Sequence, residues 1–260
     1  MKKFIGNSFF YIFARMEKLF EKLLFIVLFF SSSSLKGQVD VSFSSLKGQV
    51  DGSDAHVHLR DSLAKATEML AYNPDSIDLR LKKVAWNIEL EQWDYAKDDL
   101  DKVLFLNPTN VAGLFYRAFV NEKLHRFKFA RLDYTNLLTL VPGNLEAQLG
   151  LALLNQKDGR LTEAYDGINS LVEQFPDSAI VYAARAGIEK ERNMPELAEY
   201  DFSKALELDA DNVDYLLNHC DLLILLGRKE SALSDINRLV ALGVSRSSLR
   251  SLLDRIKSLK

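Results

Sequence analysis

The sequence predicts an all-α protein built from stacked pairs of helices, and two ladders of equally spaced residues carry this prediction. Prolines recur every 34 residues along the middle of the chain, at Pro74, Pro108, Pro142 and Pro176. Alanines recur at the same spacing, at Ala96, Ala130, Ala164, Ala198 and Ala232. A fixed period of this length indicates a repeat solenoid, in which each unit packs on its neighbours.

Each period contains the pattern of two amphipathic helices. The second helix should end at the proline, because proline has no N–H to donate and disfavours helix at the preceding residue. Apolar residues follow each ladder alanine at i+4, i+7 and i+8, which places them on one helix face. We expect the alanines to lie where two helices approach closely. Turn and capping chemistry near the prolines is predicted for Asn73, Asn107, Asp177, Asp209 and Asp211.

This pattern resembles the tetratricopeptide repeat (TPR) family, which shares the 34-residue period. With the proline counted as position 32, a small residue of the first helix stands at position 8, namely Ala118, Ala152, Ala186 and Cys220. The turn between the two helices falls at position 15, at Gly159, Asn193 and Gly227. The resemblance covers residues 57–245. It implies a right-handed superhelical solenoid with about five full repeats and a leading half-repeat.

Two parts of the array depart from the pattern. The unit that ends at Pro108 has its apolar residues one position late, so we expect a longer connection after Pro74 and a shorter turn near Glu91. Residues 246–260 are predicted to form a C-terminal capping helix. Its apolar face would consist of Leu249, Leu252, Leu253, Ile256 and Leu259.

The N-terminal sequence is of another kind. Residues 23–35 carry no charge and follow Lys18 and Lys22, but they are too few to span a bilayer, which needs about 20 residues. We interpret residues 1–37 as a signal peptide, with Met16 as a possible true start. Residues 38–56, which include a second copy of SSLKGQVD, are interpreted as a flexible linker. The expected protein is bacterial and is periplasmic or secreted; the alternative is a membrane anchor formed by an uncleaved N-terminal segment.

Composition and motifs argue against several functions. The chain has 33 basic and 36 acidic residues, and an acidic chain without a basic stripe is a poor ligand for nucleic acid. Its single cysteine, Cys220, excludes an internal disulfide and is interpreted as a packing residue. No Ser-His-Asp arrangement, phosphate loop or metal-ligand cluster is apparent, so we predict no enzyme activity, cofactor, metal or small-molecule substrate. The acidic run Asp98, Asp99 and Asp101 is interpreted as a solvated helix face.

Binding of another protein remains. In the resembled family, first helices line a concave groove that holds a peptide segment of a partner. The matching positions here are Lys82, Lys83, Trp86, Phe115, Tyr116, Phe119, Lys123, Leu149, Leu153 and Lys157. We expect a partly exposed aromatic strip edged by lysines; alternatively, Phe115 and Phe119 pack on neighbouring helices. The predicted function is an exported, non-enzymatic scaffold or adaptor without stable membrane insertion after signal cleavage. The alternative is a self-assembling structural component of the cell envelope.

Overall fold

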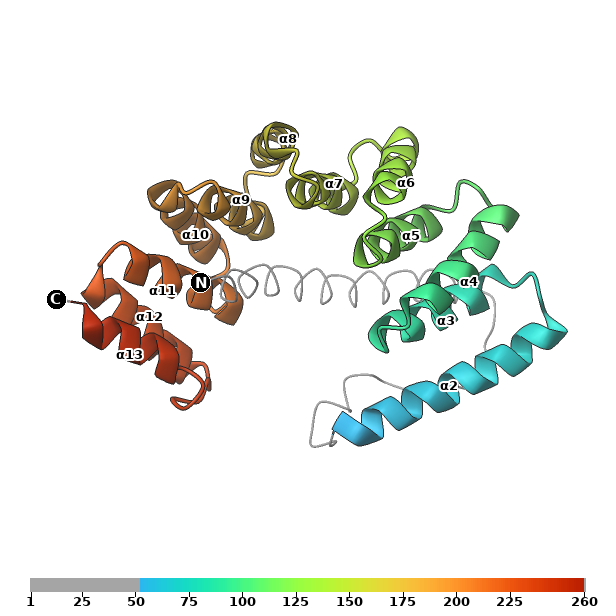
Figure 1. Cartoon of the computed structure of the whole chain (residues 1–260), viewed down its shortest axis with the longest axis horizontal. Coiled ribbons are helices and arrows are strands. Elements are labelled where there is room, and N and C mark those ends of the chain that lie inside the picture. Colours follow the sequence, from blue (N-terminus) through green and yellow to red (C-terminus); the bar gives the residue numbers. More distant parts are fainter. Residues whose placement is uncertain (1–51, 260) are drawn as a thin grey trace. The chain divides into compact units, whose positions relative to one another are not determined.

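The computed structural model describes residues 52–259, and this range contains twelve helices and no strand (Figure 1). The prediction of an all-α repeat protein is therefore confirmed. The helices are α2 (Gly52–Tyr72), α3 (Ile77–Glu89), α4 (Trp93–Leu106), α5 (Val111–Lys123), α6 (Phe127–Leu140), α7 (Leu145–Lys157), α8 (Leu161–Gln174), α9 (Ala179–Glu191), α10 (Pro195–Leu208), α11 (Val213–Leu225), α12 (Lys229–Ala241) and α13 (Arg250–Ser258).

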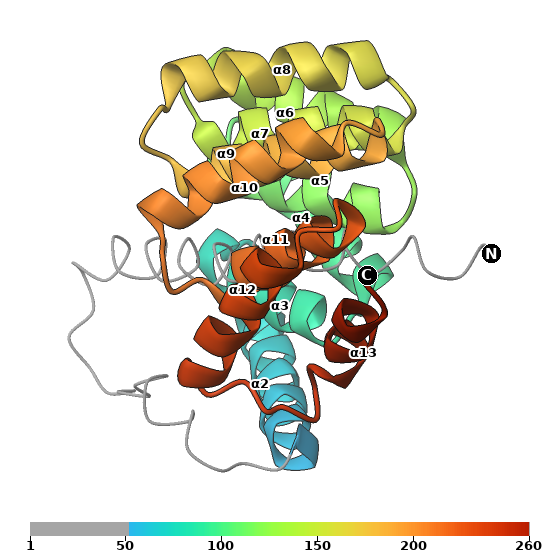
Figure 2. The same ribbon diagram turned by 90° about the vertical axis from the view of Figure 1, so that its left-hand side faces the viewer.

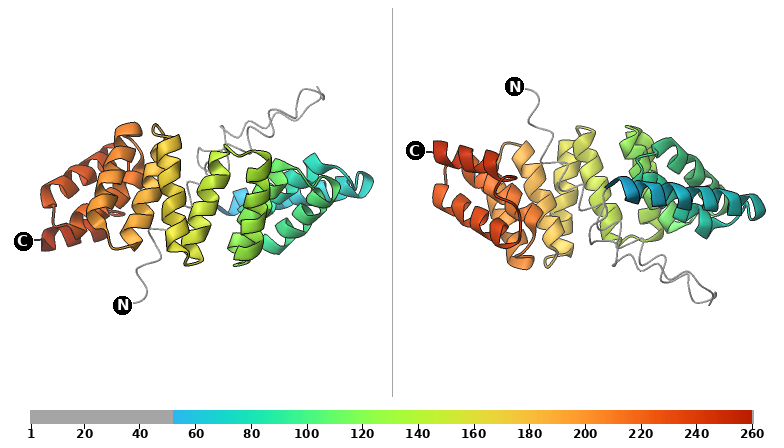
Figure 3. Two further views of the ribbon diagram at one scale, coloured as in Figure 1. Left: turned by 90° about the horizontal axis from the view of Figure 1, so that it is seen from above. Right: turned by 90° about the horizontal axis from the view of Figure 1, so that it is seen from below.

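The contacts between residues divide the chain into two compact units. Of the described residues, 52–150 belong to one unit, called here the N-terminal unit, and 151–259 to the other, called the C-terminal unit. Helix α7 begins in the first and ends in the second. Within each unit the two helices of a pair lie side by side, as α5 and α6 do in the N-terminal unit and α9 and α10 in the C-terminal unit (Figures 1 and 3).

The helix boundaries repeat with the period of the sequence. First helices begin at Ile77, Val111, Leu145, Ala179 and Val213, each 34 residues after the one before. Together with the single helix α2 at one end and α13 at the other, they give the predicted sequence of a half-repeat, five full pairs and a closing helix.

The predicted register shift in the first full pair is wrong. Helix α3 starts one period before α5, and Glu91, which ends its turn, stands one period before His125. Val84, with no exposed surface, occupies the slot that Ala118 fills in the next pair. The small residue of this pair, Ala85, lies one position later. Because the valine stands at the usual position of the alanine, the apolar pattern of the sequence looks shifted by one residue although the helix is not.

The turns within the pairs share one backbone conformation. Position 15 has a positive φ in all five pairs, at Glu91 (54°), His125 (56°), Gly159 (75°), Asn193 (60°) and Gly227 (71°). Glycine and asparagine adopt this region readily, whereas glutamate and histidine do so at some cost. The residue after position 15 closes the turn by donating its N–H to the carbonyl oxygen at position 11. In the first pair, the N–H of Gln92 donates to the carbonyl oxygen of Asn87 at 2.7 Å.

Polar residues two positions after the proline, or after Ala210 in the last pair, cap several of the first helices, although Ser178 makes no such side-chain bond to α9. The side-chain oxygen of Asn110 accepts from the N–H of Gly113 at 2.7 Å, and that of Asn144 accepts from Ala147 at 2.7 Å. Such bonds satisfy N–H groups that the helix itself leaves without a partner. The sequence pattern predicts capping at residues beside the prolines and misses these positions. Ser76 and Asn212 cap α3 and α11 in the same way.

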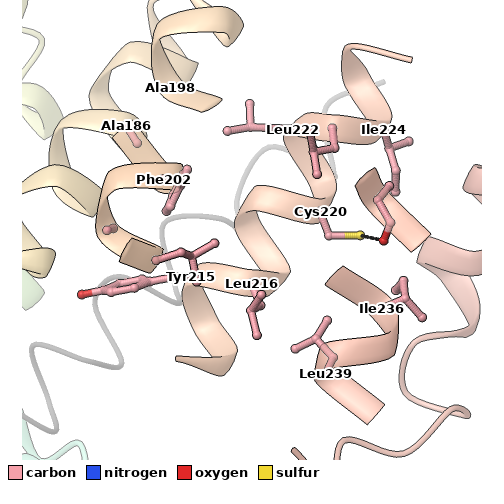
Figure 4. Packing of buried hydrophobic residues seen from close by; sticks show 14 of the residues in the cluster. Ala186, Ala198, Phe202, Tyr215, Leu216, Cys220, Leu222, Ile224, Ile236 and Leu239 are labelled. Atoms are coloured by element: carbon pink, nitrogen blue, oxygen red, sulfur yellow. Dashed lines mark hydrogen bonds between the residues drawn. The ribbon is translucent and has the colours of Figure 1, made fainter. Parts of the chain in front are cut away.

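The ladder alanines lie at the contacts between helices, as predicted. All five, Ala96, Ala130, Ala164, Ala198 and Ala232, are completely buried. In the C-terminal unit the core runs from Phe202 on α10 through Leu216 and Cys220 on α11 to Ile236 and Leu239 on α12 (Figure 4).

Helix α13 closes this core. It packs beside α11 and α12 (Figure 2), and Leu249 and Ile256 are buried in the cluster, with Leu252, Leu253 and Leu259 partly buried against it. The predicted capping helix is therefore confirmed, with helical residues at 250–258.

The N-terminal predictions fall largely outside the described residues. The signal peptide at 1–37, the start at Met16 and most of the linker precede residue 52. The linker is expected from the sequence to reach residue 56, but α2 already begins at Gly52.

Candidate functional site

The aromatic residues predicted to line a groove are buried in the N-terminal unit. Phe115, Tyr116 and Phe119 on α5 are at most 7% exposed. The ring of Phe115 meets those of Tyr116 and Tyr134 edge to face, with centroids 6.2 and 6.0 Å apart. The expectation of a partly exposed strip is thus wrong for these three. They pack inside the unit because other helices offer matching rings, Tyr134 on α6 for Phe115 and Trp93 on α4 for Phe119.

A cation lies over the edge of this cluster. The Nζ atom of Lys123 is 5.3 Å from the ring centroid of Trp93 and 5.2 Å from that of Phe119. Those two rings also meet edge to face, with centroids 6.2 Å apart. Trp93 and Lys123 are half-buried, so solvent reaches this aromatic–lysine platform. Lys123 and Phe119 belong to the predicted site, whereas Trp93 does not.

The three predicted residues on α3 differ in exposure. Lys82 is exposed and Trp86 is half-buried. Lys83 points to its own repeat, since its Nζ lies 3.0 Å from Asp99 Oδ2 on α4. Lys83 therefore has a partner within its own repeat. Its assignment to the groove rests on the shifted register predicted for this pair.

The remaining predicted residues lie on α7. Leu149 and Leu153 are buried, and Lys157 is half-buried in the last helical turn. Gly150 stands next to Leu149, and a Cβ placed on it would come within 2.6 Å of Tyr134 Cζ. Only a glycine lets α7 approach Tyr134 this closely.

A ladder of charged pairs, missed in the sequence, connects the two helices of a repeat. A basic residue at position 7 pairs with an aspartate at position 23, as Arg117 does with Asp133 through two bonds of 2.9 and 2.7 Å. Bidentate pairs of this kind are both strong and directional. The equivalent pairs are Lys83–Asp99, Arg185–Asp201 and His219–Asp235. Leu151 and Gly167 occupy these positions in the remaining repeat.

The same basic residues also reach the preceding repeat. Nη1 of Arg117 donates to Asp101 at 3.0 Å, and Nη1 of Arg185 donates to Asn169 at 3.2 Å. The solvated face predicted for Asp98, Asp99 and Asp101 is therefore wrong at Asp99, which is buried. The side chain of Asp101 is 43% exposed, although it pairs with Arg117. The 16-residue spacing of the pairs, repeated every 34 residues, is the signal that could have revealed them.

Ser203, His219 and Asp235 form a hydrogen-bonded line that the sequence pattern does not predict. His219 Nε2 lies 3.2 Å from Ser203 Oγ, and Nδ1 lies 2.7 Å from Asp235 Oδ2. Ser203, His219 and Asp235 stand 34 residues after Asn169, Arg185 and Asp201, which are bonded to one another in the same way. Ser203 lies inside α10, where backbone N–H groups are bonded along the helix and cannot form an oxyanion hole. We therefore interpret the line as a structural member of the ladder.

One carboxyl group next to the Arg185–Asp201 pair of the C-terminal unit is unusual. Glu189 on α9 is buried, its Oε1 accepts from the hydroxyl of Tyr165 at 3.4 Å, and its Oε2 has no hydrogen-bond partner among the described residues. Burial, and then the charge of Asp201, raise the pKa of Glu189 to about 7, against the opposing effect of Arg185. The three repeats before it carry asparagine at this position. Asn121, for example, donates to Asp133 at 3.3 Å.

Cys220 is a packing residue, as the sequence indicated. It is completely buried, and its Sγ lies 3.6 Å from the carbonyl oxygen of Ala232 (Figure 4). Burial raises the pKa of the Cys220 thiol to about 12. The thiolate that would act as a nucleophile is thus strongly disfavoured.

Residues 52–259 contain neither a candidate membrane span nor a candidate metal cluster. No helix there is both long and apolar enough to cross a bilayer. No group of three or more histidine, cysteine, aspartate or glutamate side chains there is arranged to hold a metal ion.

Comparisons with known proteins identify the fold. No model of a known protein family matches the chain, and no curated protein matches it. Among solved structures, a tetratricopeptide repeat protein from Parabacteroides merdae is 20% identical, with a TM-score of 0.66 over 79% of this chain and 80% of its own. A thermophilic TPR protein from Thermus thermophilus is 18% identical, with a TM-score of 0.58 over 70% of this chain and 99% of its own.

A third match is a complex. The structure of the APC/C hetero-tetramer Cut9–Hcn1 is 14% identical, with a TM-score of 0.60 over 71% of this chain and 37% of that chain. At these identities the likeness concerns the fold. The chain has the helix-pair repeat fold of tetratricopeptide repeat proteins.

Proposed function

We propose that the protein is an exported, non-enzymatic scaffold that holds a peptide segment of another protein against the first helices of its repeats. The observation that carries the proposal is the platform formed by Lys123 over Trp93 and Phe119. The half-buried ammonium of Lys123 and the half-buried ring of Trp93 offer one charge and a flat apolar surface together, whereas Phe119 is completely buried. Such a surface suits a partner with a carboxylate next to an apolar side chain.

The buried aromatics then act as the floor of the site. Phe115, Tyr116 and Phe119 fix α5 against α6 and so hold Lys123 in place, while exposed Lys82 on α3 adds positive charge in the same unit. These lysines would contribute more to the association rate and the choice of partner than to affinity. The Cut9–Hcn1 complex is a precedent for this fold in an assembly with another protein.

Affinity capture tests the proposal. The wild-type protein and the Lys123→Glu variant are used to capture proteins from the cell envelope of the source organism, with Lys65→Glu as the matched control. Lys65 is an exposed lysine on α2, remote in sequence from the platform. We expect Lys123→Glu to lose partners that wild type and Lys65→Glu both retain. If all three proteins capture the same partners equally, the platform is not the binding site.

A second variant tests the assignment of the aromatic floor. Phe119→Ala removes a completely buried ring, and such truncations cost about 3–5 kcal/mol. We expect a lower midpoint of urea unfolding, followed by circular dichroism, whether or not a partner is present. An unchanged midpoint would mean that the ring faces a groove and not a core.

Export is tested by sequencing the N-terminus of the native protein. The proposal expects a mature chain that begins between Ser33 and Gln49, produced equally well from a start at Met16. An intact Met1 or Met16 on membrane-bound material would instead support the anchor.

A further inference from the structure

Two exposed apolar pairs lie at the same repeat positions of two second helices, one in each unit. On α6 of the N-terminal unit, Phe129 is 62% and Leu132 55% exposed. On α10 of the C-terminal unit, Leu197 is 49% and Tyr200 55% exposed. Residues three apart share one face of a helix, so each pair forms a small apolar surface. Such a pair can serve as a contact surface where a partner offers a matching apolar surface and complementary charge.

The surface on α6 is basic. Lys128 precedes Phe129 directly, Arg126 stands two residues before Lys128, and both are exposed and without a salt bridge in the described part of the chain. The only acidic residue of α6, Asp133, is buried in its pair with Arg117. The exposed side of α6 therefore carries no carboxylate.

The surface on α10 is acidic at its N-terminal end. Glu196 occupies the position of Lys128, is exposed, and has no salt bridge within residues 52–259. Glu199 follows one turn later and lies 3.0 Å from Nη1 of Arg228. Lys204 also lies on α10, with its Nζ 5.8 Å from the ring centroid of Tyr200 and 2.6 Å from Glu207 Oε2. The two apolar pairs thus occupy the same positions on their helices, and the residues that directly precede Phe129 and Leu197 have opposite charge.

We propose that the α6 surface of one copy of this chain binds the α10 surface of a second copy. Phe129 and Leu132 would pack on Leu197 and Tyr200, with Lys128 opposite Glu196. The contact is heterologous, because each copy contributes a different surface. Its small area makes it weak and concentration-dependent, and its exposed charges make it sensitive to salt. It uses none of the residues of the proposed peptide site, so either proposal can fail alone.

A comparison with helix α4 explains why the partner of the α6 surface is assigned to α10 and not to α4. Tyr95 on α4 is 66% exposed at the position of Phe129, and Asp94 precedes it as Glu196 precedes Leu197. At the second apolar position, however, α4 carries Asp98. Covering a charge with an apolar side chain is costly. Tyr95 is therefore the matched control for both surfaces.

Sedimentation equilibrium of the purified protein, up to about 1 mM, tests the proposal. We expect reversible self-association that Phe129→Ser and Leu197→Ser each weaken at least about fivefold, and that Tyr95→Ser leaves unchanged. All three sites are exposed, and circular dichroism checks that the variants fold. An equimolar mixture of Phe129→Ser and Leu197→Ser should associate again, as a one-to-one pair, because each variant keeps the surface that the other has lost.

A charge exchange provides the second arm. Lys128→Glu should weaken association, and adding Glu196→Lys in the same chain should restore it. A wild-type protein that stays monomeric at about 1 mM would overturn the proposal. So would association that the two serine variants leave intact, or a mixture of them that fails to pair.

Discussion

Replacing Glu189 by glutamine should remove a pH dependence of stability that originates inside the C-terminal unit. Glu189 faces Tyr165 from α8, Arg185 from its own helix and Asp201 from α10, and its pKa is raised from 4.5 to about 7. Between these two values the folded chain holds a proton on Glu189 that the unfolded chain has released. Stability is therefore highest on the acidic side, falls as the pH rises from 4.5 to about 7, and does not change further above that.

The pKa interval sets the size of the effect. At 1.36 kcal/mol for each pKa unit, raising the pKa from 4.5 to about 7 corresponds to about 3 kcal/mol in the free energy of unfolding. Glutamine has nearly the same shape and cannot ionise, so Glu189→Gln should keep the stability that the protonated form has at all pH values. The variant should equal the wild type near pH 4.5 and exceed it by up to about 3 kcal/mol near pH 8.

Urea unfolding followed by circular dichroism, repeated across this pH range, measures the difference. Glu173→Gln is the control, because Glu173 is an exposed carboxylate on α8 of the same unit. A carbon-13 NMR titration of the Glu189 carboxyl group in the folded protein gives its pKa directly. Parallel stability curves for wild type and Glu189→Gln, or a measured pKa near 4.5, would refute the reasoning.

Three further predictions concern packing. Gly150→Ala should lower the free energy of unfolding by about 1–3 kcal/mol, because its Cβ would lie 2.6 Å from the buried ring of Tyr134. Gly167→Ala should be neutral or stabilise α8, because its Cβ would lie 3.5 Å from the nearest side chain. Equal unfolding midpoints for the two variants would contradict this. Ala164→Leu should cost about 1–3 kcal/mol and lower the denaturation midpoint, and an unchanged midpoint would place Ala164 outside the helix contact. The Cys220 thiol should resist a thiol reagent at about pH 8 until the chain is unfolded, and rapid labelling of the folded protein would show that it is accessible.

The backbone of this protein was largely predictable because its repeats leave a periodic record. Pro108 and its equivalents mark helix ends, and Ala130 and its equivalents mark the closest helix contacts, so each ladder confirms the phase of the other. The one error of register arose where two neighbouring residues, Val84 and Ala85, exchange the roles of large and small. A pattern of apolar residues cannot distinguish that exchange from a shift, whereas the positive φ at Glu91 can.

The side chains of the candidate site were less predictable. Position in a repeat indicates that Phe115 and Phe119 lie on the inner side of a helix pair, but burial depends on which rings stand opposite, here Trp93 and Tyr134. Charge was misjudged for a related reason. Asp99 belongs to an acidic run that the sequence pattern places in solvent. It is buried because Lys83 and Arg80, 16 and 19 positions earlier, form salt bridges with it.

The charged ladder also has a consequence for how the chain unfolds. Arg117 ties its own second helix to the repeat before it, through Asp133 and Asp101, so these two repeats should lose their structure in one step. Leu151, at the same position of the next repeat, has no polar side-chain atom with which to make such a tie. Repeat arrays unfold as a chain of nearest-neighbour couplings, so an added tie between two repeats joins their unfolding. Amide exchange should therefore show one common opening rate for the slowly exchanging protons of α3 to α6.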